Sequence, residues 1–150
     1  MDKESAGDRM KTNEVHFINS LLKEAKLTKM SGEGKIKVVK ILKATRPVAS
    51  EFDTFRNEAI EKLRPEGFDQ MQPKLVKMQE GDSALSEAEK KEVSSFFDAY
   101  AADVNRCIAE EGEKEVDITF DHLTEAEFTA LCETNDWQAG VIYELMDKLT

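Results

Sequence analysis

The chain has 150 residues, of which 40% are hydrophobic and 35% charged, and its formal net charge is −10. This length suits one domain, and no apolar run approaches the ~18 residues of a membrane-spanning helix. The polar start of the chain lacks the apolar centre of a secretory signal, and two cysteines are too few for a disulfide framework. We therefore expect a cytoplasmic protein with no membrane partner.

The two signs of charge are distributed unevenly. Residues 11–46 carry nine lysines or arginines against three acids, whereas residues 47–150 carry ten against twenty-five. The whole chain should repel nucleic acid and anionic lipid, although its N-terminal third could contact an acidic partner.

Residues 1–11 show no periodic pattern, and we expect them to form a flexible N-terminal tail in which Met10 could be an alternative start. Thr12 or Asn13 can cap a short amphipathic helix that ends before the Ser31–Gly34 loop. The apolar residues of this helix recur at helical spacing: Val15, Ile18, Leu22 and Ala25.

Residues 35–63 carry the strongest periodic signal in the first half of the chain. The apolar stripe keeps its phase through Pro47, which predicts one long helix kinked at that proline. The stripe consists of Val38, Ile41, Leu42, Val48, Phe52, Phe55, Ala59 and Leu63.

Residues 68–83 are difficult to assign, with a short helix or strand expected around Leu75, Val76 and Met78. Ser86 and Glu89 then form a capping box that opens a second long helix, which ends at Gly112. We expect this helix to pack antiparallel on the first and to bring Phe97 against Phe52. Its apolar stripe consists of Val93, Phe96, Phe97, Tyr100, Ala101, Val104, Cys107 and Ile108.

Val116, Ile118 and Phe120 alternate with polar residues, which predicts a half-buried strand. A strand needs a hydrogen-bonding partner, and residues 74–78, residues 35–39 or another protein could provide it. Because an unpaired strand edge invites strand addition, we assign these three residues to a candidate interaction surface.

Thr124 and Glu127 form another capping box, and Asn135 or Asp136 should cap a final helix that bears Trp137. The expected fold is therefore mainly α: a long helical hairpin with a small C-terminal strand-helix-helix unit. We expect a single helical domain over residues 12–150, with a hairpin lobe at 12–111 and a strand-helix-helix lobe at 112–150.

A search for catalytic chemistry yields no catalytic, metal-binding or cofactor-binding residues. Gly34 and Lys35 precede a helix as in a phosphate-binding loop, but Ile36 replaces the hydroxyl residue that would bind magnesium. His16 and His122 lack further ligands at metal-binding spacing. His122 beside Asp121 could act as a base, but no nucleophile motif accompanies the pair.

Two charged segments remain as candidates for binding. The acidic residues 110–117 form a solvated turn or, alternatively, a mimic of nucleic-acid phosphates. The basic segment, with Lys35, Lys37, Lys40, Lys43 and Arg46, contacts solvent, the acidic half of the chain or an acidic partner. From it we select Lys40, Lys43 and Arg46 as candidate interaction residues.

Residues 115–120, the Leu123–Thr124 step and the apolar residues 141–146 together resemble small uncharacterised helical proteins of tailed bacteriophages and prophages. Residues 12–14 and the lysine-rich helix at 36–42 are similar too. The resemblance follows the layout of residues 12–149 and about thirty of them in detail. It implies a phage or prophage origin, a location in the bacterial host cell or the virion, and no catalytic residue.

These observations predict a non-enzymatic phage or prophage protein that acts through protein contacts. It would be a structural or assembly component or an accessory factor, and its partner would be itself, a virion protein or a host protein. The alternative is an acidic inhibitor that binds a host nucleic-acid enzyme.

Overall fold

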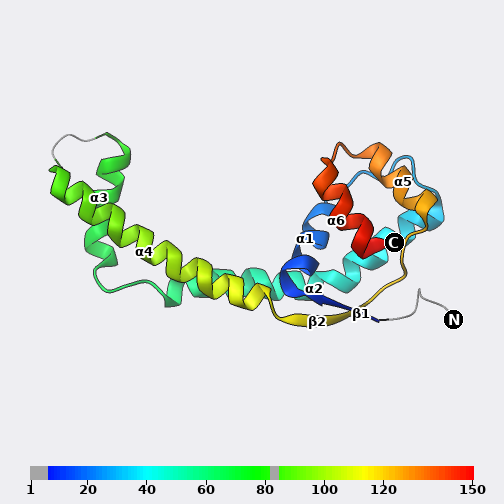
Figure 1. Ribbon diagram of the computed structural model, residues 1–150, viewed down its shortest axis with the longest axis horizontal. Helices are drawn as coiled ribbons and strands as arrows, with labels where there is room; N and C mark the ends of the chain where they lie inside the picture. The colour runs from blue at the N-terminus through cyan, green and yellow to red at the C-terminus, as the bar shows by residue number, and fades with distance from the viewer. Residues whose placement is uncertain (1–6, 82–84) are drawn as a thin grey trace. The chain divides into compact units, whose positions relative to one another are not determined.

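The computed structural model of the chain describes residues 7–81 and 85–150. These residues form six helices and a two-stranded antiparallel sheet, and 72% of the described residues are helical. The elements are β1 (Gly7–Lys11), α1 (Thr12–Leu22), α2 (Gly32–Lys62), α3 (Phe68–Gln79), α4 (Glu87–Gly112), β2 (Glu115–Thr119), α5 (Glu125–Thr134) and α6 (Ala139–Leu149) (Figure 1). The predicted fold class, mainly α with a minor β part, is confirmed.

The chain divides into two compact units. Unit 1 comprises residues 1–52 and 112–150, and unit 2 comprises residues 53–111. This division differs from the expected one at residue 112, because the first 52 residues group with the C-terminal segment. The helices α2 and α4 each contribute residues to both units.

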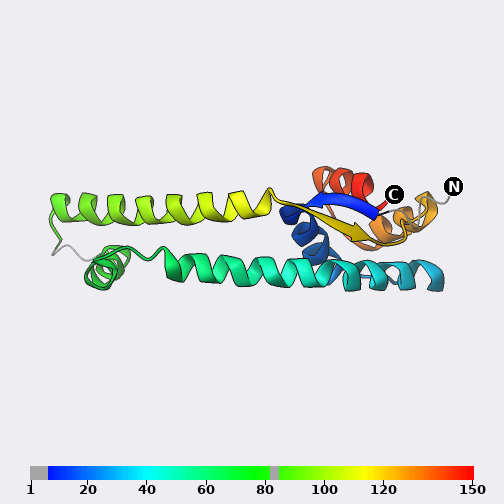
Figure 2. The same ribbon diagram turned by 90° about the horizontal axis from the view of Figure 1, so that it is seen from below.

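In unit 1, β1 pairs antiparallel with β2, with Gly7 opposite Thr119 and Lys11 opposite Glu115 (Figure 2). The expected tail at residues 1–11 is therefore wrong for residues 7–11, and residues 1–6 lie outside the described part of the chain. The alternative strand partners are also wrong, because residues 74–78 belong to α3 and residues 35–39 belong to α2.

The sequence of β1 conceals this strand, because Met10 is its only large apolar residue. The Met10 side chain is buried in unit 1. Arg9 and Lys11 instead form ion pairs with Glu115 and Glu113, at 2.6 and 2.8 Å. Cross-strand charge pairs contribute little energy each at an exposed position, but they fix which strand fits beside β2.

The core of unit 1 combines the apolar faces of all its helices with one face of the sheet. The main chain links these elements further, since Leu123 N–H donates to the Leu149 carbonyl at 2.7 Å and Thr12 N–H donates to the Lys114 carbonyl at 2.8 Å. The core residues are Met10, Val15, Ile18, Leu22, Met30, Val38, Ile41, Ile118, Phe120, Leu123, Phe128, Leu131, Leu145 and Leu149. Full burial of one such side chain stabilises the fold by about 1.5–3 kcal/mol.

Unit 2 consists of the end of α2 together with α3 and α4, and it confirms the second long helix. The residues around Leu75 are helical rather than extended. Phe68 of α3 lies edge-on to Phe97 and Tyr100 of α4, at centroid distances of 5.8 and 5.7 Å. The Tyr100 hydroxyl donates to the Ile60 carbonyl, and α4 runs antiparallel to the end of α2 within this unit (Figure 2).

Two helix starts follow the predicted capping boxes, and two other helices start at residues other than the predicted caps. Glu127 N–H donates to the Thr124 hydroxyl at 3.2 Å, and Glu89 N–H donates to the Ser86 hydroxyl at 3.1 Å. The N-cap of α1 is Lys11 rather than Thr12 or Asn13. The final helix, α6, starts after Gln138 rather than at Asn135 or Asp136. The Asn135 side chain is already engaged with the Lys26 main chain.

Phe52 and Phe97, which the two apolar stripes were expected to bring together, belong to different units. Phe52 lies edge-on to His16 in unit 1 at a centroid distance of 5.4 Å, whereas Phe97 contacts Phe68 and Phe96 in unit 2. The two rings belong to different apolar clusters, although they lie on the two helical stripes that the sequence predicts.

Candidate protein interface

The strand residues selected from the sequence lie inside unit 1 rather than on a docking surface. Ile118 and Phe120 are buried in its core, and Val116 is half-buried against that core. The alternation of β2 therefore identifies the inward face correctly. The side chains on that face support the fold and are not available to a partner.

The acidic residues 110–117 are largely engaged with β1. Glu113 pairs with Lys11, and Glu115 and Asp117 both approach Arg9, the latter at 3.9 Å. These pairs lie at the exposed edge of the sheet and explain why a polar strand adds to β2. The arrangement favours a structural role for this segment over phosphate mimicry.

The basic segment of α2 divides between two sides of the helix. Lys37 is buried and forms an ion pair with Glu127 of α5 at 2.9 Å, in line with the proposed contact to the acidic half of the chain. Lys40, Lys43 and Arg46 are exposed and form no ion pair with any residue in the described ranges. Lys35 is also exposed and forms no ion pair within the described residues, so Lys37 is the one cation of this segment that is engaged.

The same exposed side of α2 carries two aliphatic residues that the sequence analysis did not select. Ile36 is 57% exposed and Val39 is 42% exposed. Ile36 lies four residues before Lys40, and Val39 lies four residues before Lys43. This spacing could have identified both aliphatic residues from the sequence, because residues three and four apart share one face of a helix.

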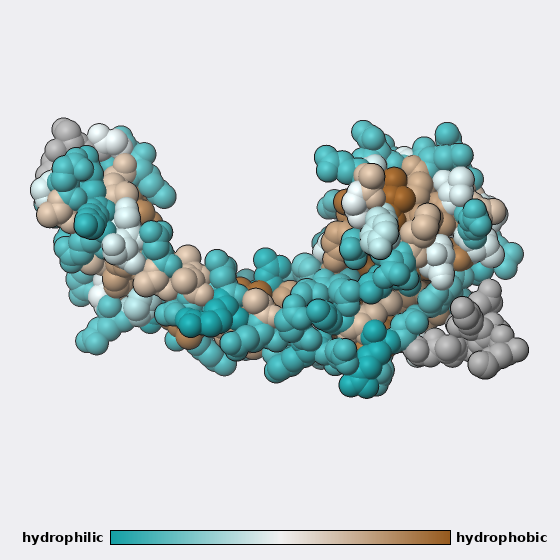
Figure 3. Space-filling model, viewed as in Figure 1, coloured by the Kyte–Doolittle hydropathy of each residue, from teal (hydrophilic) through white to brown (hydrophobic). Residues whose placement is uncertain are grey.

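The apolar residues of unit 2 are covered less completely than those of unit 1. The buried apolar residues within the described part of unit 2 are Ala59, Leu85, Val93 and Val104, and α3 contributes none. Ile60, Leu63 and Val76 are between 37% and 45% exposed. Apolar residues accordingly reach the surface over α3 and α4 in Figure 3. We call Ile60, Leu63 and Val76 the unit 2 stripe.

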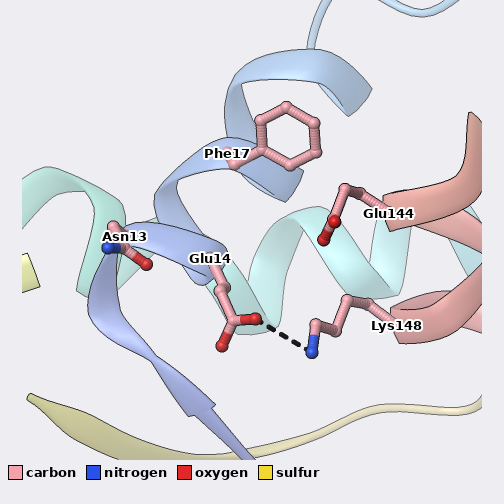
Figure 4. Close-up of a pocket in the computed structure, with 5 residues that line it drawn as sticks. All are labelled: Asn13, Glu14, Phe17, Glu144 and Lys148. Carbon is pink, nitrogen blue, oxygen red and sulfur yellow. Dashed lines mark ion pairs between the residues drawn. The ribbon is translucent and has the colours of Figure 1, made fainter. Parts of the chain in front are cut away.

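A cavity of about 240 Å³ lies between α1 and α6 in unit 1. Asn13, Glu14 and Phe17 line it from α1, and Glu144 and Lys148 line it from α6 (Figure 4). The Lys148 ammonium lies 2.9 Å from the Glu14 carboxylate, so these two charged groups neutralise each other. Glu144 is the third charged residue of the lining and forms no ion pair within the described residues.

Burial and hydrogen bonds shift the pKa values of several ionisable groups in unit 1. Burial opposes ionisation of Glu14, but the Lys11 main-chain N–H and the Lys148 ammonium outweigh it and lower the pKa of Glu14. The hydrogen bond to Glu14 likewise raises the pKa of Lys148. Burial alone raises the pKa of the Cys132 thiol, which disfavours the reactive thiolate.

His122 forms two contacts that hold its ring in place. Its Nε2 lies 2.5 Å from the Asp8 carboxylate, and its Nδ1 lies 3.2 Å from the main-chain oxygen of Thr150. The ring also stacks on Phe120. Asp8, rather than the neighbouring Asp121, is its carboxylate partner, and neither ring nitrogen is left open for proton transfer to a substrate.

Within residues 7–81 and 85–150, no group of three or more histidine, cysteine, aspartate or glutamate side chains could hold a metal ion. In the same residues, no helix combines the length and apolarity needed to cross a bilayer. Comparisons with protein-family models, with curated proteins and with solved structures find no match to this chain.

Proposed function

We propose that this chain is a non-enzymatic phage or prophage protein that acts through protein-protein contacts and assembles with a second copy of itself through unit 2. The origin rests on the resemblance of residues 115–120 and 141–146 to small phage proteins. The self-association rests on one structural observation, the incomplete burial of the apolar residues in unit 2.

The energetics of unit 2 support a partner. Apolar burial is the main favourable contribution to folding, and a helical unit with few buried side chains has little of it. A second helical unit that covers the unit 2 stripe would remove more apolar area from water. In this respect unit 2 resembles half of a helical bundle.

The charge pattern of unit 2 supports a second copy as that partner. A two-fold contact places the same surface patch on both subunits, so strong charge of one sign at the patch would oppose it. Five cations in the described part of unit 2 are neutralised by acids three or four residues away, whereas Lys74 and Lys77 of α3 form no ion pair there. The pairs are Arg56–Asp53, Lys62–Glu58, Arg64–Glu61, Lys90–Glu87 and Arg106–Asp103.

Sedimentation velocity of the full chain tests this proposal. The wild-type protein should form a dimer that dissociates on dilution, and Val76→Lys should shift it to the monomer by placing a charge in the apolar contact. Gln70→Lys is the matched control, because Gln70 is also exposed on α3, lies about 120° from Val76 around the helix axis and receives the same charge. Circular dichroism should show equal helix content in both variants.

Added salt provides a second readout. The chain carries a net charge of −10, so two copies repel each other and salt should strengthen an association that depends on apolar contact. A wild-type chain that remains monomeric up to about 1 mM, or a Gln70→Lys variant that dissociates as Val76→Lys does, would contradict the proposal.

A further inference from the structure

The exposed side of α2 in unit 1 combines aliphatic and basic side chains on one face. At 3.6 residues per turn its members lie within an arc of about 120°. We call this set the basic α2 face: Ile36, Val39, Lys40, Lys43 and Arg46.

The opposite side of the same helical segment is fixed in the core. Val38, Ile41 and Thr45 are fully buried. The Thr45 hydroxyl donates to the Ile41 carbonyl at 2.9 Å and accepts a hydrogen bond from the Asn19 side chain at 3.1 Å. Because the packed side holds the helix, the basic α2 face is presented on a rigid element and little order is lost when a partner binds.

We propose that the basic α2 face binds an acidic helical segment of a partner protein. The partner's carboxylates would pair with Lys40, Lys43 and Arg46, and its aliphatic side chains would cover Ile36 and Val39. Charge complementarity selects an acidic partner, because these three cations form no ion pair with the described residues of their own chain.

The composition of the face favours a protein over a nucleic acid. A phosphate backbone would pair with the cations but would leave the two aliphatic side chains uncovered. The face contains no aromatic side chain on which bases could stack. A helix with glutamates beside leucines can pair with the cations of the face and cover its aliphatic side chains.

Fluorescence anisotropy on the full chain tests the proposal with a defined probe. The probe is a labelled synthetic helix of about 18 residues, long enough for five turns, with leucines along one stripe and glutamates on both sides of it. A second peptide carries glutamine at every glutamate position. The acidic peptide should bind at least about tenfold more tightly than the glutamine peptide, and added salt should weaken its binding.

Three variants separate the contributions to binding. Lys40→Glu/Lys43→Glu should weaken binding of the acidic peptide by about tenfold or more. Lys26→Glu/Lys29→Glu changes the net charge equally at exposed positions outside the face and should leave binding within about twofold of the wild type. Ile36→Ser/Val39→Ser should weaken binding without lowering the melting temperature, because both side chains are exposed.

Three results would overturn the proposal. These are no binding of the acidic peptide up to about 1 mM, equal losses in the two lysine variants, or tighter binding of duplex DNA than of the peptide to the same face. The test is independent of the proposed function, because the face lies in unit 1. Val76→Lys, which is designed to abolish self-association through unit 2, should bind the peptide as the wild type does.

Discussion

The Glu127 carboxylate serves two elements of unit 1 at once. It accepts the Thr124 main-chain N–H at the start of α5 and pairs with Lys37 of α2. Burial opposes its ionisation, but these hydrogen bonds and the Lys37 charge outweigh it, so the pKa of Glu127 lies below its ordinary value of 4.5. The sequence predicted the capping box but could not place Lys37, because a helical repeat does not show which basic residue faces the core.

We predict that Glu127→Gln lowers the free energy of unfolding by about 1–3 kcal/mol at neutral pH, because it removes the charge paired with Lys37. A carboxyl with a lowered folded pKa stabilises the fold above its unfolded pKa, and this contribution is lost as the pH falls through the folded value. Urea unfolding between about pH 5 and 3 should therefore show a shallower acid destabilisation in the variant. Glu125→Gln, an exposed change in the same helix, is the control, and equal pH profiles for both variants would refute this account.

Asn135 joins two loops through its side-chain amide. Its oxygen accepts the Lys26 N–H, and its nitrogen donates to the carbonyls of Lys26 and Leu131, each at 2.9 Å. We predict that Asn135→Ala lowers the free energy of unfolding by about 1–3 kcal/mol, because all three bonds are lost. Asn135→Asp keeps the acceptor oxygen and should lower the free energy of unfolding by less. Equal melting temperatures for the wild type and Asn135→Ala would contradict the stabilising role of these hydrogen bonds.

At the scale of elements, the sequence predicts those helices and strands whose buried residues recur at a regular spacing. α1, α2, α4 and α5 follow from apolar stripes and capping boxes, because each of these helices presents a repeating face to a core. The sequence does not predict β1, because its pairing depends on β2, which lies over a hundred residues away, and because a strand with Met10 as its only large apolar residue has no alternating pattern. The predicted start of α6 was wrong because the Asn135 side chain bonds to the Lys26 main chain and does not cap α6.

Gly67 provides an element-scale prediction at the turn between α2 and α3. Its φ of 89° lies in the left-handed region, where a Cβ atom is strained. Gly67→Ala should therefore lower the free energy of unfolding by about 1 kcal/mol. In Gly32→Ala the added methyl group meets no atom within 4 Å, and the change should be neutral or stabilising in thermal melts. A silent Gly67→Ala would show that this turn tolerates another backbone geometry.

At the scale of the molecule, one apolar stripe of α2 serves two units that differ in burial. Phe52 is buried in unit 1, whereas Leu63, on the same predicted stripe, is 37% exposed in unit 2. Periodicity predicts which face of a helix is apolar but not how completely other elements cover it. The division into units and the incomplete burial of unit 2 therefore required the structure.

Hydrogen exchange of the full chain, measured in dilute and in concentrated solution, tests the proposed self-association most directly. If unit 2 is completed by a second copy, the amides of α3 and α4 should exchange more slowly in the concentrated sample, while those of unit 1 remain unchanged. Val76→Lys should abolish this concentration dependence and Gln70→Lys should retain it. Equal protection of α3 and α4 at both concentrations in the wild type would contradict the proposal.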